Sequence, residues 1–172
     1  MAGSLGRRLL LVPIGMSRAG VAVVGTAAFD DPADGRALAR LLGSWGALPR
    51  RIAGMIEPTA PTALRHVASA LREPPWHRGA VLCVGAAVHA IAPPFGQAAA
   101  QALEDAVVLG ELVAAGLERP LLLQRFMDRR AQRVQRLHAL TERAAHWVLH
   151  PEPATDLVQI AGEIGALVAQ PA

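Results

Sequence analysis

The feature that most constrains the fold is a strand, turn and helix pattern between Gly79 and Ala106. A short, continuous apolar run at 80–84 predicts a strand that is buried on both faces. A turn rich in Gly and Pro follows it. The alanine-rich stretch after Gly96 then predicts a helix that ends at Gly116. Because the first turn of a helix leaves backbone N–H groups unpaired, the turn at 96–100 is the expected chemical centre of the chain.

The remaining patterns predict one hairpin and several helices. The apolar runs 9–12 and 21–24 are separated by a polar loop with glycines, which favours a β-hairpin. Segment 62–72 fits either a strand or a helix. The expected helices are 32–42 with Asp31 as N-cap, 49–56, 120–149, and 154–169 with Thr155 or Asp156 as N-cap.

Composition bounds the class of protein. A chain of 172 residues with 52% hydrophobic residues fits one domain with an ample core. All 17 basic residues are Arg and they are scattered, so the net charge of +3 does not indicate nucleic-acid binding. The single cysteine, Cys83, predicts a reduced, cytoplasmic setting, and the apolar run near Arg7 and Arg8 is too short for a membrane span.

Two stripes of polar residues follow helical spacing in the segment 120–149. The residues of the second stripe, three histidines and one glutamate, recur every four positions, but they lack the zinc-protease pattern, so no metal is expected. The arginine stripe is interpreted as a solvated face paired with acids, with docking of a partner or an acidic ligand as the alternative. The stripes consist of Arg125, Arg129, Arg130, Arg133 and Arg136, and of His138, Glu142, His146 and His150.

The turn and the helix after it keep a frame of nine residues: Gly85, His89, Pro93, Pro94, Gly96, Gln97, Glu104, Asp105 and Ala106. This frame resembles the second flavin-binding motif of the class A FAD-dependent aromatic hydroxylases, the para-hydroxybenzoate hydroxylase family. The resemblance covers about 7–148 and implies the second half of that family's fold. The family's Gly-x-Gly-x-x-Gly turn, which holds the ADP pyrophosphate, follows no strand here.

Three positions depart from the family motif. Its Asp is Ala86, its second Gly is Ala98 and its Asn is Ala100. The resemblance therefore implies a degenerate flavin motif, and we expect no cofactor in the isolated chain. FAD is expected only if a partner chain carries the dinucleotide-binding half. The motif positions assigned by the resemblance are Gly85, Ala86, Pro93, Gly96, Gln97, Ala98, Ala99 and Ala100.

Two roles are open for the polar groups of this motif. The backbone donors at Gln97 and Ala98 are suited to holding a carboxylate, a phenolate or an enolate. His89 is expected to support the motif loop, and it is also the candidate catalytic acid–base group. Asp105 is expected to brace that loop or a neighbouring helix.

Together these observations predict an α+β fold, in which a small, mostly antiparallel sheet packs with a helical half that carries one flavin-motif strand. The expected division is 1–75, with the sheet and short helices, and 76–172, with the motif strand and long helices, forming one compact unit. The resemblance implies a truncated, flavin-free monooxygenase relative. It would bind a small aromatic or polyketide-like molecule and catalyse a cyclisation, isomerisation or dehydration in specialised metabolism.

Two alternatives remain open: a subunit of a split monooxygenase, and a non-catalytic interaction protein. The expected partners are a small-molecule ligand, a second copy of the chain in a homodimer, or a chain with a dinucleotide-binding half. Self-association is expected because the predicted strands would otherwise leave unpaired backbone groups at a sheet edge.

Overall fold

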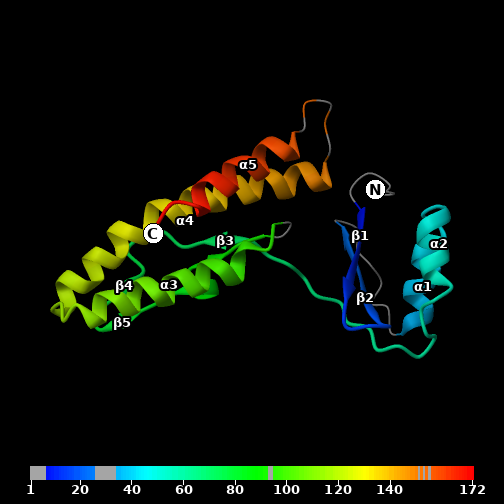
Figure 1. The fold of residues 1–172 in the computed structure, drawn as a ribbon, viewed down its shortest axis with the longest axis horizontal. Helices are drawn as coiled ribbons and strands as arrows, with labels where there is room; N and C mark the ends of the chain where they lie inside the picture. Colours follow the sequence, from blue (N-terminus) through cyan, green and yellow to red (C-terminus); the bar gives the residue numbers. More distant parts are fainter. Residues whose placement is uncertain (1–6, 26–33, 93–94, 151, 153, 155) are drawn as a thin grey trace. The chain divides into compact units, whose positions relative to one another are not determined.

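The structure, a computed structural model, describes residues 7–25, 34–92, 95–150, 152, 154 and 156–172. The chain divides into two compact units, one of residues 1–66 with 149–151 and one of residues 67–148 with 152–172. Short antiparallel strand pairs and long helices make up these units, so the predicted α+β class is confirmed (Figure 1). The predicted division after residue 75 stays a prediction.

The first unit contains the predicted hairpin. Strand β1 (Arg7–Pro13) pairs antiparallel with β2 (Ala19–Gly25), and Leu10 lies opposite Ala22. Both strands are rich in Val and Leu, which favour the extended backbone. Leu10 is nevertheless 47% exposed, because no further strand or helix in the described residues of this unit covers it fully.

Two short helices complete the first unit. Helix α1 (Gly35–Gly43) begins after Asp34, whose side chain accepts a hydrogen bond from the backbone of Ala37 at 3.1 Å. Helix α2 (Ala47–Ala53) follows it closely and packs against it. The predicted cap Asp31 lies outside the described residues, and the cap that the structure shows is Asp34.

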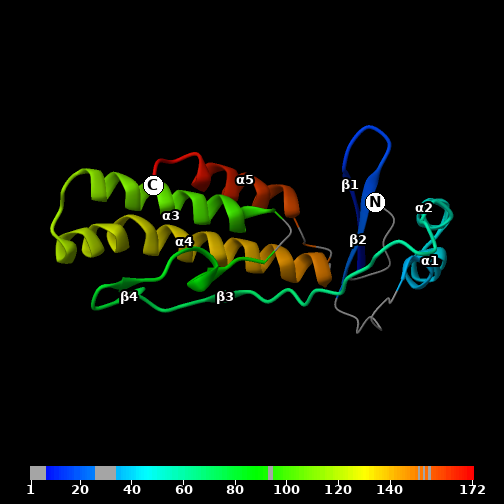
Figure 2. The same ribbon diagram turned by 90° about the horizontal axis from the view of Figure 1, so that it is seen from below.

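The second unit is built on three helices (Figures 1 and 2). Helix α3 (Gln97–Ala114) and helix α4 (Arg119–Leu149) form an antiparallel hairpin around a turn at Gly116, which has a positive φ of 68°. Helix α5 (Leu157–Val168) lies along α4 and is capped by Asp156, one of the two predicted caps. The prediction of these three helices is confirmed to within a few residues at each end.

Two apolar clusters hold the second unit together. The first joins α3 to α4 and also takes in Trp76 and Val88 from the chain before α3. The second joins α4 to α5 and includes Ile91. The fully or nearly fully buried members are Trp76, Val88, Val108, Leu112, Phe126 and Val134 in the first cluster, and Ile91, Leu137, Ala144, Ile160 and Ile164 in the second.

The strands of the second unit are short. They pair antiparallel as β3 with β6 and as β4 with β5, with the 3-10 helix η1 between β5 and β6. The predicted strand 80–84 is wrong in its length and its burial: only β5 forms a paired strand, its partner among the described residues is β4, and Val81 is 66% exposed. Segment 62–72 forms a strand only at β3. The bounds are β3 (Ala70–Leu71), β4 (His77–Arg78), β5 (Val81–Leu82), η1 (Gly85–Ala87) and β6 (His89–Ala90).

Within the part of the chain that the structure describes, every helix is too short or too polar to cross a lipid bilayer.

Candidate functional site

The motif turn is held by its backbone. Gly85 has a φ of +59°, a conformation that side chains with a Cβ rarely adopt. An added Cβ at Gly85 would lie 3.2 Å from the Cβ of Ala102 on α3, so the turn approaches that helix closely. The Gly85 N–H donates to Oδ2 of Asp105 at 2.8 Å. Glycine at this position therefore lets η1 lie against α3.

Asp105 is the acceptor around which the turn is organised. Its side chain is fully buried on α3, and Oδ2 accepts from His89 Nε2 at 2.7 Å as well as from Gly85. Oδ1 accepts from Nε of Arg130 on α4 at 2.8 Å. Burial by itself raises the pKa of Asp105, but the hydrogen bonds from His89, Gly85 and Arg130 outweigh it and hold the pKa below its usual range. The prediction that Asp105 braces the loop or a neighbouring helix is confirmed, since it does both.

Arg130 is the cation that balances this buried carboxylate. Its side chain is fully buried and also meets Glu104 at 2.9 Å and the side-chain oxygen of Gln101 at 2.8 Å. Glu104 in turn pairs with Arg133 at 2.8 Å. Buried charges are stable in this form because they are paired and hydrogen-bonded on several sides.

The interpretation of the arginine stripe as a solvated face is therefore wrong in its centre. Arg130 and Arg133 face α3 and α5, and Arg129 pairs with Glu111 and with the backbone oxygen of Ala172. These contacts occupy most of the donors that an external acidic partner would need. The stripe mainly joins the helices of this unit to each other.

His89, the predicted acid–base group, lies inside this network. Its side chain is fully buried, and its ring packs against Trp76 with 5.9 Å between the ring centroids. Because the ionised carboxylate of Asp105 can only accept, the short contact assigns the proton to Nε2 of His89. Nδ1 has no hydrogen-bond partner among the described residues. This placement fits the support of the motif loop, and the catalytic role stays a prediction.

The start of α3 carries the predicted anion site. Gly96 precedes the helix with a φ of +66°, and no side chain caps the first turn. Gln97 is half-buried, and its side-chain amide donates to the backbone oxygen of Phe95 at 3.3 Å. The next three residues, Ala98–Ala100, are exposed, and Pro93 and Pro94 lie outside the described residues.

An exposed apolar row continues from this turn along α3. It consists of Ala99, Leu103 and Val107, which are spaced four residues apart and so share one face of the helix. Leu103 is 68% exposed and Val107 is 59% exposed. We call these three residues the α3 apolar row. The sequence pattern shows that α3 is apolar on several sides, but not which side the rest of the chain leaves open.

The chemistry of the motif residues does not fit FAD held by this chain alone. FAD carries an anionic pyrophosphate and a chain of hydroxyl groups. The side chains at 84–88 and 96–100 are all apolar except Gln97, whose amide already donates within the loop. Backbone N–H groups at the start of α3 are the donors that remain, and no carboxylate or cation stands at Ala86 or Ala98. The side chains at these positions therefore provide no charged or hydroxyl partner for the pyrophosphate and the hydroxyl chain of the cofactor.

The buried network contains residues that the sequence did not reveal. Gln101, Glu104 and Arg130 were not expected to act together, because nothing in the helical spacing shows which acid meets which arginine. The one usable signal is the position of Gln101, Glu104 and Asp105 on adjacent turns of one face. Two acids on one helix face indicate that a cation on a facing helix pairs with them.

Comparisons with known proteins support the resemblance of the chain to flavin-dependent enzymes. Residues 57–141 match the family described as FAD binding domain. The chain is 36% identical over 94 residues to the FAD-dependent monooxygenase YetM of Bacillus subtilis, covering 55% of this chain and 25% of YetM. It is 34% identical over 92 residues to 2-heptyl-3-hydroxy-4(1H)-quinolone synthase of Pseudomonas aeruginosa, covering 52% of this chain and 24% of that enzyme.

The fold is also found in solved structures. Crystal structures of Klebsiella pneumoniae HpxO, one with FAD and one with FAD and uric acid, superpose with TM-scores of 0.70 and 0.66. Sequence identity is 21% and 22%, and 97% of this chain is covered in both. The chain covers 44% and 43% of HpxO, and about a quarter of the length of the two curated relatives named above. The chain is thus similar to FAD-dependent monooxygenases over about half of its length, and its residues 57–141 match the family described as FAD binding domain.

Proposed function

We propose that this chain supplies the flavin-facing segment of a two-part monooxygenase fold and holds no FAD by itself. The second part is a dinucleotide-binding part, which packs on the α3 apolar row and binds most of the cofactor. The observation that carries this proposal is the exposed row of Ala99, Leu103 and Val107, which starts at the motif turn. Contiguous apolar residues on a protein surface mark interaction sites.

The identity of the proposed partner follows from the position of the α3 apolar row and from its lack of charge. The row is uncharged and begins where the unpaired N–H groups of α3 begin, so a partner that covers it also encloses this turn. The buried bonds from Asp105 to Gly85 and His89 keep the turn in shape without a ligand. In this arrangement His89 positions the loop and does not touch a substrate. We place the assembly in the cytoplasm, in keeping with the single cysteine, Cys83.

The experiment compares the chain alone with the chain produced together with the dinucleotide-binding part of YetM. Alone and with excess FAD, the chain should elute from gel filtration without the visible absorption of flavin. The pair should elute as one coloured complex. Leu103→Glu should abolish this complex, whereas Val158→Glu, at a position on α5 that is 83% exposed, should not. A coloured chain without a partner, or a pair that never associates, would contradict the proposal.

A second candidate is a flavin-free relative that acts on a small aromatic or polyketide-like molecule. It is favoured by the neutral turn at Ala98–Ala100, where backbone donors face solvent beside small side chains. A phenolate or enolate held by the N–H groups of Gln97 and Ala98 would be stabilised for cyclisation, isomerisation or dehydration. For this candidate we propose a role in specialised metabolism, including antibiotic biosynthesis.

Titration of the labelled chain with salicylate tests this second candidate. Amide shifts confined to 96–100 would support this candidate, and unchanged amides there would count against it.

Self-association is the alternative use of the α3 apolar row. Sedimentation velocity of the wild type and of Leu103→Glu distinguishes a homodimer on this row from a monomer.

A further inference from the structure

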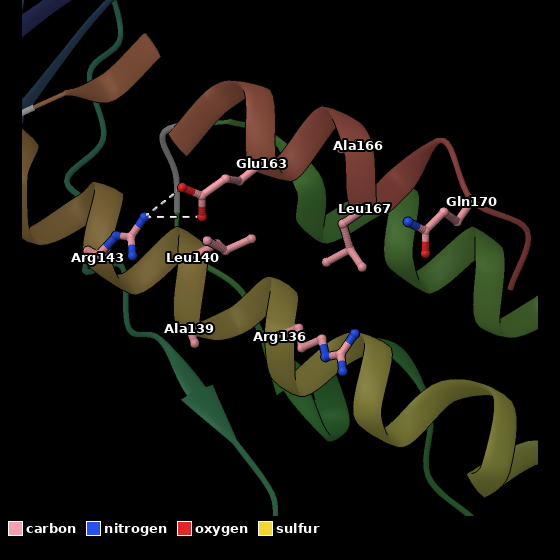
Figure 3. Close-up of a pocket in the computed structure, with 8 residues that line it drawn as sticks. All are labelled: Arg136, Ala139, Leu140, Arg143, Glu163, Ala166, Leu167 and Gln170. Carbon is pink, nitrogen blue, oxygen red and sulfur yellow. Dashed lines mark hydrogen bonds and ion pairs between the residues drawn. The ribbon is translucent and has the colours of Figure 1, made fainter. Parts of the chain in front are cut away.

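A groove runs between α4 and α5, away from the motif turn (Figure 3). It has a volume of about 600 Å³, which lies within the range of small-molecule sites. Four residues of α4 and four from α5 and its C-terminal end line it. The lining residues are Arg136, Ala139, Leu140, Arg143, Glu163, Ala166, Leu167 and Gln170.

The middle of the groove is apolar. Leu140 and Leu167 point into the space between the two helices (Figure 3). Ala139 and Ala166 add short apolar side chains to the lining. Leu140 and Leu167 also pack against the second core cluster, so the floor of the groove is fixed by the core.

The two ends of the groove differ in charge. At one end Arg143 and Glu163 bridge the helices at 3.2 Å, and Arg143 also lies 5.6 Å from the ring of Trp147. At the other end stand Arg136 and Gln170 (Figure 3). Arg136 is exposed, and no acid pairs with it among the described residues. One end is thus neutralised and the other carries a free positive charge.

A second hollow of about 150 Å³ adjoins the groove at the Arg136 end and shares Arg136, Leu167 and Gln170 with it. Its lining is polar and adds Asp128, Arg129, Gln132, Arg133 and Pro171. Arg129 and Arg133 are already bonded to acids and to backbone oxygens. Among the described residues, Arg136 is therefore the arginine at this junction without an acidic partner, and Asp128 is the acid that opposes an anion there.

We propose that this groove binds a medium-chain fatty acid anion. The carboxylate lies against the guanidinium of Arg136 and the amide of Gln170, and the alkyl chain runs over Leu140 and Leu167 toward the Arg143–Glu163 bridge. Seven residues of helix separate Arg136 from Arg143, about 10 Å at 1.5 Å per residue, which suits an extended alkyl chain. Because only the Arg136 end of the groove carries a free charge, the groove selects a ligand with one anionic end.

The test is an amide NMR titration of the full chain with sodium decanoate below its micelle concentration. Shifts should concentrate at 136–143 and 163–170, and they should be absent from the start of α3. Arg136→Gln should weaken binding about fivefold, as expected for one exposed ion pair. The matched control is Arg125→Gln, which removes the same charge from an exposed position of α4 outside both hollows and should leave binding unchanged.

A second variant tests the alkyl site independently. Ala166→Leu fills the groove from an exposed position, so it should weaken decanoate binding without disturbing the fold. Decyltrimethylammonium and 1-decanol serve as probes with the same chain and no anion, and both should bind more weakly than decanoate. Equal binding of all three probes, shifts that map outside the groove, or no effect of either variant would overturn the proposal.

Discussion

The Nε2 atom of His89 lies 2.7 Å from Oδ2 of Asp105, and both side chains are fully buried. This contact joins the chain before α3 to the middle of α3, and Asp105 extends it to Arg130 on α4. Three residues of the flavin-motif frame, Gly85, His89 and Asp105, thus hold the turn in place. The three alanines at 86, 98 and 100 are all exposed, so none of them belongs to this buried network.

Replacing Asp105 by Asn should destabilise the chain. The amide removes the negative charge that Arg130 faces in the interior and provides only one accepting oxygen for three donors. Breaking a buried ion pair from one side costs about 3 kcal/mol. Urea unfolding of Asp105→Asn should show this loss. Asp128→Asn, at an exposed position, should stay within about 0.5 kcal/mol of the wild type, and equal losses in both variants would contradict the assigned role.

Acid should remove the contribution of Asp105 to the free energy of unfolding. Its folded pKa is lowered, so the unfolded chain takes up this proton at a higher pH than the folded chain does. The stabilisation is therefore complete above about pH 4, the usual range for Asp, and is lost as the pH falls through the lower folded value. Urea midpoints measured between neutral pH and acid should converge for the wild type and Asp105→Asn. A constant difference across this range would show that Asp105 is not the group that titrates.

Two glycines should respond in opposite ways to alanine. Gly85 has a positive φ and lies close to Ala102, so Gly85→Ala should cost about 1–2 kcal/mol. Gly110 lies within α3, and an added Cβ would meet nothing within 4 Å. Gly110→Ala should therefore stabilise the chain by about 0.5–1 kcal/mol. Thermal unfolding of both variants measures the difference, and the same sign for both would contradict the assigned backbone conformation of the turn.

The sequence allows the helices of the second unit to be predicted well, because their signals are local. Gly116 ends one helix and Asp156 caps another, and neither signal depends on distant residues. The strand 80–84 could not be judged in the same way. A continuous apolar run shows that a segment can be buried, but the neighbours that would bury it are set by the rest of the fold.

The residues of the site also differ in whether the sequence alone reveals them. His89, Gly96 and Asp105 were identified through the resemblance of the chain to the flavin-motif frame, which a sequence shows directly. Arg130 was assigned to a solvated face, because helical periodicity gives the direction of a side chain relative to its own helix only. Its burial depends on the approach of α3, which brings Asp105 and Glu104 to it. Pairing across helices is a tertiary property.

Arg133 joins three helices, and this arrangement requires the shape of its guanidinium group. Its Nε lies 2.8 Å from Glu104 on α3, and its two terminal nitrogens donate to the backbone oxygens of Leu167 and Val168 at the end of α5. A lysine ammonium lacks this fork and cannot reach all three oxygens. Arg133→Lys should therefore cost about 1–2 kcal/mol, as expected when charge-assisted hydrogen bonds are lost.

The substitution Arg133→Lys should change local opening of α5 as well as the stability of the whole chain. Arg133 donates to the backbone oxygens of Leu167 and Val168 in the last turn of α5, so amide hydrogen exchange in α5 should become faster in Arg133→Lys. The matched control is Arg125→Lys, an exposed position of α4, and it should leave exchange in α5 unchanged. Unaltered exchange in α5 of Arg133→Lys would show that α5 is held to α4 by its apolar side chains, Ile160 and Ile164, without help from this arginine.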